Sequence, residues 1–180
     1  MACDISLGRS ESCKSAIGGI DAVYLANYVA DLGSAVTYDA TNTDVITDVN
    51  NVTTLYKFTL KGNNGFTQKI NSSRENGTTF VEQTLTLDLK GLDIATTKQI
   101  KLLSYGRPHV VVRNRQGQYF LMGLEHGADM ADSSIEMGTA MGDFSGYKVT
   151  LVATEKLPAN HLNCTSEATL ATLFSSATIV

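Results

Sequence analysis

The sequence lacks tryptophan, has only two prolines and three cysteines among 180 residues, and contains no long apolar run. No stretch approaches the ~18–20 consecutive apolar residues of a transmembrane helix. Cys3, Cys13 and Cys164 form no C-x-x-C pair, and an odd number of cysteines makes no disulfide framework, so we expect free thiols in a reducing cytoplasm. The first residues, MACDISLGRSESCK, lack the apolar core of a secretory signal. No membrane partner and no secretion are therefore expected.

The motifs of common enzyme classes are also missing. The sequence contains no G-x-S-x-G elbow, no P-loop and no G-x-G-x-x-G in a strand–helix context. Its histidines, His109, His126 and His161, are far apart and belong to no H-E-x-x-H motif. We expect neither an enzyme nor a cofactor site.

One cluster has residue types that bind metals. It is the run Glu125-His126-x-x-Asp129-x-x-Asp132. Carboxylate oxygens suit a hard cation such as calcium, but this spacing matches no calcium-binding loop. We therefore interpret this run as a solvated acidic loop and predict no metal site there.

Charge is unevenly distributed along the chain. Residues 15–56 contain no lysine or arginine. The charged residues of 90–115 are basic except Asp93, and those of 116–146 are all acidic. These segments either form separate solvated faces or mediate head-to-tail self-association, in which one subunit's basic face meets its neighbour's acidic face. The candidates for the inter-subunit contact or a channel lining are Asp39, Asp44, Asp48, Lys98, Lys101, Arg113, Arg115, Glu125, Asp129 and Asp132.

Alternating apolar residues indicate several half-buried strands. The longest alternation starts at Gly146 and places Tyr147, Val149, Leu151 and Ala153 on one face. Further strands are predicted at 20–28, 78–89 and around 134–139. Hairpins are predicted around the turn residues GNNG at 62–65, joining 55–61 to the strand that begins at Phe66, and around residues 114–117.

Helical spacing is confined to two places. A helix is predicted over about 96–104, capped by Asp93 or Thr96 and stopped by Gly106 and Pro108. A short C-terminal helix is expected after Thr165 or Ser166, because Leu170, Leu173 and Phe174 share one helical face. Residues 29–52 hold either two short strands or one long loop.

These elements predict a mainly β protein, a β-sandwich or small barrel with one flanking helix. The expected division is an N-terminal arm at 1–18, one β-rich structural domain at 19–159 with a long loop at about 29–52, and a tail at 160–180. Open sandwich edges must be blunted or paired, and in an oligomer they can pair across subunits. The predicted core comprises Tyr56, Phe58, Leu85, Leu87, Val110, Val112, Val149 and Leu151.

Three segments resemble small structural proteins of tailed-phage virions. They are CKSAIGGIDAVYLANY at 13–28, GQYFLMGLEHGADM at 117–130 and GTAMGDFSGYKVTLVATEKLPA at 138–159. The similarity is to the tail-tube or tail-ring type found in crAss-like phages of Bacteroidetes hosts. The resemblance implies a β-sandwich or barrel with a flanking helix and a long loop that joins neighbours. It also implies rings of hexamer- or dodecamer-like symmetry around a channel for DNA.

The resemblance carries no catalytic residues. It implies a virion tail protein that is made in the bacterial host cytoplasm, contacts other tail or connector proteins and lets phage DNA pass without sequence-specific binding. An acidic lumen would repel DNA phosphates and let the genome slide, whereas basic side chains would bind them. Residues within 15–56 or 116–146 are therefore expected to line the channel or the ring interface. Two alternatives remain open: a head decoration or head–tail connector protein, and a carbohydrate-binding β-sandwich. Carbohydrate-binding sandwiches usually present exposed tryptophan or tyrosine platforms, and the absence of tryptophan argues against this class.

Overall fold

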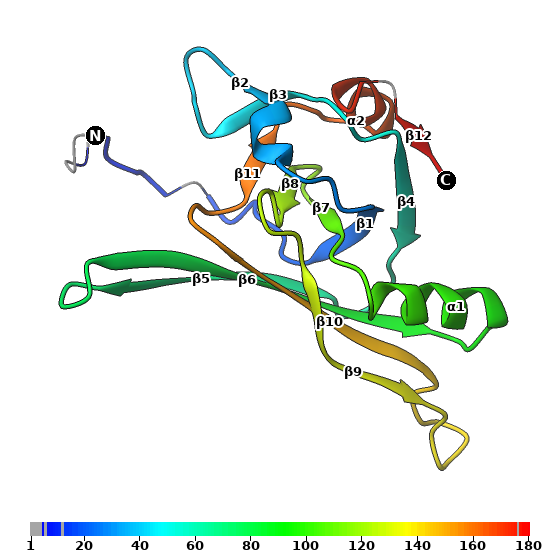
Figure 1. Ribbon diagram of the computed structural model, residues 1–180. Helices are drawn as coiled ribbons and strands as arrows, with labels where there is room; N and C mark the ends of the chain where they lie inside the picture. Colours follow the sequence, from blue (N-terminus) through cyan, green and yellow to red (C-terminus); the bar gives the residue numbers. More distant parts are fainter. Residues whose placement is uncertain (1–4, 6, 12, 176) are drawn as a thin grey trace.

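Two β-sheets and two short α-helices build the protein in the computed structural model, which describes all residues except 1–4, 6, 12 and 176 (Figure 1). The first sheet has eight strands in the order β12-β4-β1-β7-β8-β11-β3-β2. Their bounds are β1 Ile20–Ala26, β2 Val36–Tyr38, β3 Val45–Val49, β4 Thr54–Thr59, β7 His109–Asn114, β8 Tyr119–Met122, β11 Asn160–Leu162 and β12 Thr178–Ile179. The outer strands β12 and β2 do not pair with each other in the described chain, so this sheet is open.

The second sheet has four long antiparallel strands in the order β5-β6-β10-β9. They are β5 Gly65–Ser73, β6 Thr78–Lys90, β9 Asp129–Glu136 and β10 Gly146–Glu155. The β5–β6 hairpin and the β9–β10 hairpin project from opposite ends of this sheet (Figure 1). The mainly β fold, a sandwich with a flanking helix, is thus confirmed, and the barrel alternative is not found among the described strands.

Strands β1 and β7 form the centre of the molecule because both of their faces are buried. Tyr24 of β1 and Val111 of β7 point into one core, whereas Val23 and Val112 point into the other. This position explains the near-continuous apolar sequences IDAVYLA and HVVV, since a strand that is buried on both sides shows no polar alternation.

The first core fills the concave side of the eight-stranded sheet. Helix α2, Glu167–Leu173, covers it together with the 3₁₀ turn η1, Leu32–Ala35. The Ser166 hydroxyl accepts a hydrogen bond from the Thr169 amide and caps α2, and Leu170 and Phe174 are fully buried below the helix. Because the helix is short, its burial rather than its intrinsic propensity keeps it folded.

The second core lies between the two sheets. Alternate residues of β6 and β10, including Leu85 and Leu151, face β1 and β7. Helix α1, Ile94–Leu103, closes the flank with Ile100, and Asp93 caps it by accepting the Thr96 amide. The predicted helix at 96–104 and its cap are therefore confirmed to within two residues.

The predicted hairpin around GNNG is wrong. Strand β4 pairs with β1 and β12, whereas β5 pairs with β6, so residues 60–64 carry the chain from one sheet to the other. The prediction that the face of β4 carrying Tyr56 is buried is also wrong, since Leu55 is buried and Tyr56 is exposed. The remaining predicted core residues are buried, except Phe58, which is partly exposed.

Residues 29–52 are not one long loop. They hold η1, β2 and β3, as in the two-strand alternative. The polar run after Leu124 is also shorter than expected, because β9 starts at Asp129. In the tail, α2 was predicted, but β11 and β12 were not; both are two or three residues long, too short for a visible alternation.

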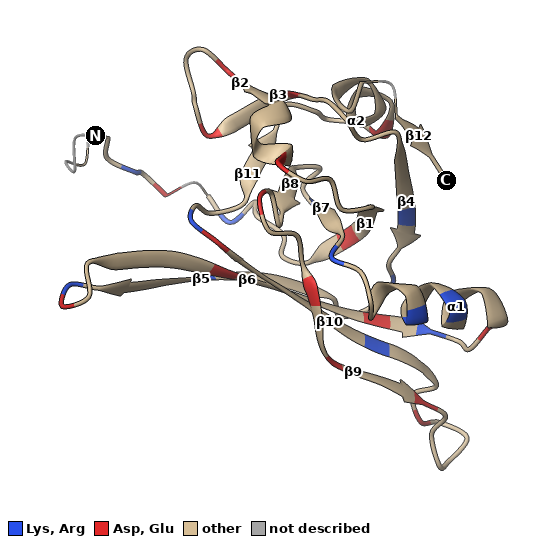
Figure 2. Ribbon diagram, in the orientation of Figure 1, with Lys and Arg blue, Asp and Glu red and all other residues tan. Residues whose placement is uncertain are grey.

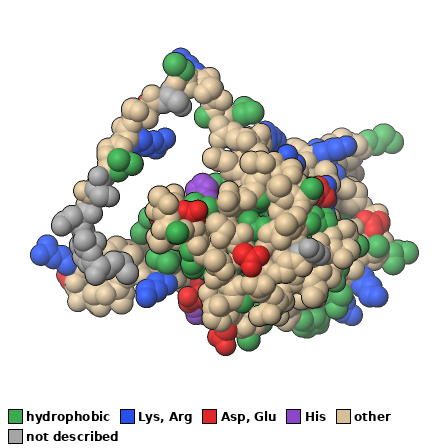
Figure 3. Space-filling model, turned by 90° about the horizontal axis from the view of Figure 1, so that it is seen from above, with side chains coloured by type: hydrophobic (Ala, Val, Ile, Leu, Met, Phe, Trp, Pro, Cys, Tyr) green, Lys and Arg blue, Asp and Glu red, His purple; other side chains and the backbone are tan. Residues whose placement is uncertain are grey.

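The described residues of the N-terminal arm, up to Gly18, form no helix or strand and stand away from the body of the protein (Figure 3). Cys3 lies outside the described residues, Cys13 is exposed and Cys164 is buried. Neither α1 nor α2, nor any other helix in the part described, is long and apolar enough to cross a membrane.

The core between the sheets predicts a large effect for Leu151→Ala. Leu151 is fully buried, so its truncation leaves a cavity and should lower the free energy of unfolding by about 2–5 kcal/mol. Leu157→Ala is the matched control, because Leu157 is largely exposed and its truncation should change stability little. Urea denaturation followed by circular dichroism measures both; equal effects would contradict the described packing.

The two described cysteines should differ in reactivity. Burial raises the pKa of the Cys164 thiol to about 12, so at pH 8 almost none of it is thiolate, and the thiolate is the reactive form. Iodoacetamide at pH 8 should label Cys13 rapidly and Cys164 only after denaturation, as read by peptide mass spectrometry. Equal labelling of both in the native protein would refute this assignment.

Candidate functional site

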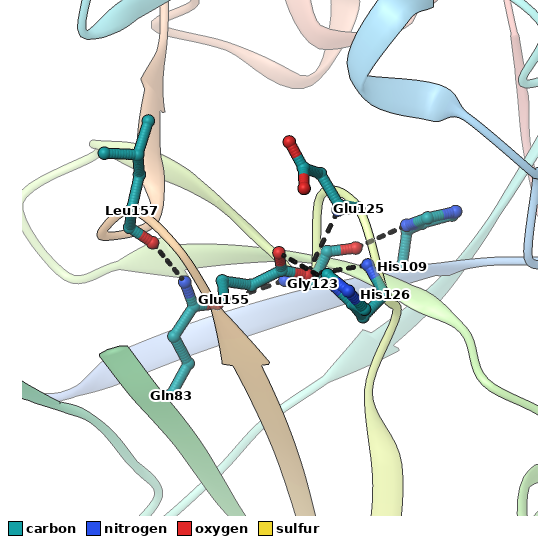
Figure 4. A network of polar contacts seen from close by, with 7 residues as sticks. All are labelled: Gln83, His109, Gly123, Glu125, His126, Glu155 and Leu157. Atoms are coloured by element: carbon teal, nitrogen blue, oxygen red, sulfur yellow. Dashed lines mark hydrogen bonds and ion pairs between the residues drawn. The ribbon is translucent and has the colours of Figure 1, made fainter. Parts of the chain in front are cut away.

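The turn between β8 and β9 is the most densely connected polar site in the part described. It carries the chain from the eight-stranded to the four-stranded sheet. The Glu155 carboxylate accepts hydrogen bonds from the backbone amides of Glu125 (3.1 Å) and His126 (2.9 Å) and contacts His126 Nδ1 at 3.2 Å (Figure 4). Glu155 itself is buried. A buried carboxylate that receives several donors holds the turn in place.

Gln83 of β6 holds the same turn from the other side. Its side-chain oxygen accepts the Gly123 amide at 3.0 Å, and its amide nitrogen donates to the Leu157 carbonyl at 3.3 Å (Figure 4). Because Gln83 is buried, both bonds satisfy groups that water does not reach. Gln83 thus ties two of the four crossings between the sheets, β8–β9 and β10–β11, to the sheet core, and Glu155 holds the first of these as well.

His109 is a structural residue in this network. Its Nδ1 contacts the Gly123 carbonyl, and its Nε2 accepts the Val29 amide at 3.0 Å. This pattern places the proton on Nδ1. Tyr28 stacks on the imidazole at 5.3 Å, and Arg107 lies over the Tyr28 ring. His109 therefore connects the end of β1 to the β8–β9 turn.

Two glycines permit the tight path of the turn. Gly123 and Gly127 both have positive φ, and a Cβ atom on either would lie within 2.7 Å of backbone atoms, of Gly127 and Arg107 respectively. Only glycine adopts this conformation and this close approach without strain.

The structure brings Glu125 and His126 together with Glu155, but Asp129 and Asp132 are not part of this group. The potential ligand atoms lie within 4.8 Å of one another. Glu155 already accepts from two amides and the imidazole, so its carboxylate serves to fix the turn. Among the described residues, no serine hydroxyl or cysteine thiol is hydrogen-bonded to a histidine.

The acidic candidates near the N-terminus lie on the β2–β3 hairpin, at the outer end of the eight-stranded sheet (Figure 2). Asp39 accepts the amides of Thr41 and Asn42, and these hydrogen bonds lower the pKa of its carboxyl. Asp48 accepts from Asn50. Asp39 and Asp48 thus have local partners within this hairpin, and Asp44 lies between them.

The basic candidates divide into two pairs. Arg113 lies 3.6 Å from Asp21, and Arg115 donates to the carbonyls of Gly62 (3.0 Å) and Gly18 (3.4 Å), so both arginines have partners within the chain. Lys98 and Lys101 are exposed on α1 and form no ion pair with any described residue. Of the basic candidates, only the α1 lysines remain available to a partner.

A groove beside α1 was not found from the sequence. It measures ≈ 440 Å³ and lies between α1 and the strands β1 and β4. Its apolar lining includes Tyr28, Tyr56, Phe58, Leu102 and Leu103, and Lys98 and Arg107 border it. The sequence contains a signal for it in the alternation of β4, but the prediction places Tyr56 in the core, whereas the face of β4 that carries Tyr56 is exposed.

The outer strands of the four-stranded sheet, β5 and β9, have no strand partner on their outer sides among the described residues. The sheet face that points away from the core is rich in threonine, with Thr67, Thr84, Thr86, Thr150 and Thr154. Its charged residues are Lys69, Lys90 and Lys148 and the carboxylates Glu82, Asp88, Asp129 and Glu136, of which Glu136 pairs with Lys148 at 3.0 Å.

No family model, no curated protein and no solved structure matches the chain.

The network at the β8–β9 turn predicts that Glu155→Ala is destabilising. The amides of Glu125 and His126 lose their acceptor, and unpaired buried groups cost about 1–3 kcal/mol each, whereas the mostly exposed His126 imidazole can bond water instead. Glu125→Ala, which keeps the backbone amide and removes an exposed carboxylate, is the control and should leave the melting temperature unchanged. If calcium or zinc raised the melting temperature of the native protein but not of Glu155→Ala, the site would be a metal site and not a structural one.

Proposed function

We propose that this chain is a structural subunit of a tailed-phage virion that assembles head-to-tail into a tail tube or tail ring around a channel for DNA. The observation that carries the proposal is the open four-stranded sheet, whose strands β5 and β9 have no partner on their outer edges among the strands described. Exposed edges present unpaired amides and carbonyls that readily pair with another strand. In an assembly these edges become the seam between subunits.

The strand directions suit a ring. Each strand in the order β5-β6-β10-β9 runs opposite to its neighbour, so β5 and β9 themselves run in opposite directions. A second copy in the same orientation therefore brings its β5 beside this chain's β9 in antiparallel pairing, without turning over. Such a contact is heterologous, and a repeated rotation closes it into a ring.

The outer face of this sheet suits a channel wall. It presents hydroxyls and a near balance of lysines and carboxylates, and of the basic segment 90–115 it contains only Lys90. A wall of this kind offers DNA phosphates few cationic contacts, so it neither binds the strand tightly nor reads its sequence. Of the acidic candidates, Asp129 lies on this face, whereas Asp39, Asp44 and Asp48 lie on the other sheet.

The surface area also supports assembly. The chain exposes 11478 Å², whereas a compact monomer of 19.3 kDa exposes about 8,500 Å². The projecting arm and the two long hairpins account for such an excess (Figures 1 and 3). Surface of this extent is typical of subunits that bury it against neighbours.

The proposal predicts closed rings or stacked tubes of the purified protein in negative-stain micrographs, with hexamer- or dodecamer-like masses in native mass spectra. Exclusively monomeric protein at high concentration would contradict it. Rings that bind only to a head portal complex, and never stack, would instead favour the head–tail connector.

Single prolines in β5 test the edge directly. Successive backbone amides of an outer strand point alternately to the partner strand and to the open side. Lys69 and Ile70 are neighbours, so a proline at one of them removes an outward-facing amide, and a proline at the other removes an amide of the β5–β6 ladder. The outward variant should keep the monomer's melting temperature and lose ring formation, whereas the inward variant should lose stability. Rings formed by a fully folded outward variant would exclude the β5 edge from the seam.

A further inference from the structure

The loop between β9 and β10 presents apolar side chains to solvent. Met137 is 79% exposed, Met141 is fully exposed, and Ile135 at the end of β9 is 52% exposed. Monomeric proteins seldom gather apolar side chains at the tip of a projecting hairpin, and such a cluster marks an interaction site.

This tip is ordered by its own hydrogen bonds. The Asp143 carboxylate accepts the amides of Thr139 (2.9 Å) and Ala140 (2.7 Å), and these bonds lower the pKa of Asp143. The Asp143 amide donates to the Ala140 carbonyl at 3.1 Å. The methionines are therefore held on a preformed turn, which reduces the entropy lost when they bind.

The α1 groove has the complementary surface. Tyr28, Tyr56 and Phe58 supply aromatic walls, and a methionine thioether packs favourably against aromatic rings. Lys98 and Arg107 border the groove, whereas the tip carries the Asp143 carboxylate, which is hydrogen-bonded to neutral amides; the nearby Glu136 is paired with Lys148. Apolar contact and opposite charge thus favour the same pairing.

The positions of tip and groove suit neighbouring copies in a ring. Gly146, which follows the tip, pairs with Lys90, and α1 begins at Ile94, so tip and α1 lie at the same end of the four-stranded sheet. The tip joins β9 to β10 at one edge of the sheet, whereas the β4 wall of the groove lies beside residues 88–90 of β6, on the side of the sheet whose edge is β5. Three strand spacings, about 14 Å, separate these edges.

We propose that the β9–β10 tip of each subunit inserts into the α1 groove of the next copy of this chain. Met137 and Met141 fill the aromatic groove, and Lys98 and Arg107 face the Asp143 carboxylate of the neighbour. This contact rests on the proposed ring, in which β9 of one copy adjoins β5 of the next. It locks the seam at the end of the sheet where α1 lies.

The first test is Met141→Lys, which places a cation against Lys98 and Arg107. Its melting temperature as a monomer should match that of the native chain, because Met141 contacts solvent, but the protein concentration needed for half-maximal ring formation should rise about tenfold or more. Leu157→Lys, at an exposed apolar residue outside the tip and groove, is the matched control and should form rings as the native chain does. Normal rings with Met141→Lys would overturn the contact.

Cysteine cross-linking tests the pairing itself. In a background with Cys3→Ser and Cys13→Ser, the double variant Met141→Cys/Leu102→Cys should give a ladder of dimers, trimers and larger species on oxidation, because a head-to-tail contact propagates. Either single variant should give no ladder beyond dimers. An internal cross-link that leaves monomers only would overturn the proposal.

The two levels of the hypothesis fail differently. If the native chain forms rings but the double variant gives no ladder, the tip–groove contact is wrong and the ring assignment stands. If the native chain forms no rings under any condition tested, the proposed function fails and the tip–groove contact fails with it.

Discussion

The packing of the four-stranded sheet against β1 and β7 is the interaction on which the rest of the structure depends. It buries the inward face of β10 from Tyr147 to Glu155 and most of that of β6, and it makes β1 and β7 interior strands of the molecule. One face of the four-stranded sheet packs against this core, so its other face points outward, and neither of its edges pairs with a further strand in the part of the chain that the structure describes. The channel wall and the strand seam of the proposed assembly follow from this arrangement. The β8–β9 turn, held by Gln83 and Glu155, is one of the four connections between the two sheets.

Much of the local structure could be predicted because residue patterns determine it locally. The alternation after Gly146 and the cap at Asp93 each depend on neighbours within a few residues. The pairing of β4 could not be predicted in this way. The GNNG turn is typical of a hairpin, but β4 gains more by joining β1, where Leu55 is fully buried, than by pairing with β5. Tertiary burial outweighed turn chemistry at this point.

The candidate site was predicted less well than the fold. Gln83 and Glu155 were missed, although the sequence contains a signal for both. Gln83 lies at an inward position of β6 between the apolar residues Val81 and Leu85, and Glu155 lies at the inward position of β10 that follows Ala153. A polar residue at such a position must find buried partners. The charged segments were recognised, but only the structure distinguishes Arg113 and Arg115, which have partners within the chain, from Lys98 and Lys101, which have no ion pair among the described residues.

The account of assembly combines three properties of one sheet: free antiparallel edges, a hydroxyl-rich face with few unbalanced cations, and a methionine tip at the end where α1 lies. Hydrogen–deuterium exchange of assembled against dissociated protein tests whether β5 and β9 form the seam between subunits. Alternate amides of β5 and β9 should become protected on assembly, whereas those of β2 and β12, at the edges of the other sheet, should exchange as before. Assembled rings in which β5 and β9 exchange as fast as in the monomer would contradict it.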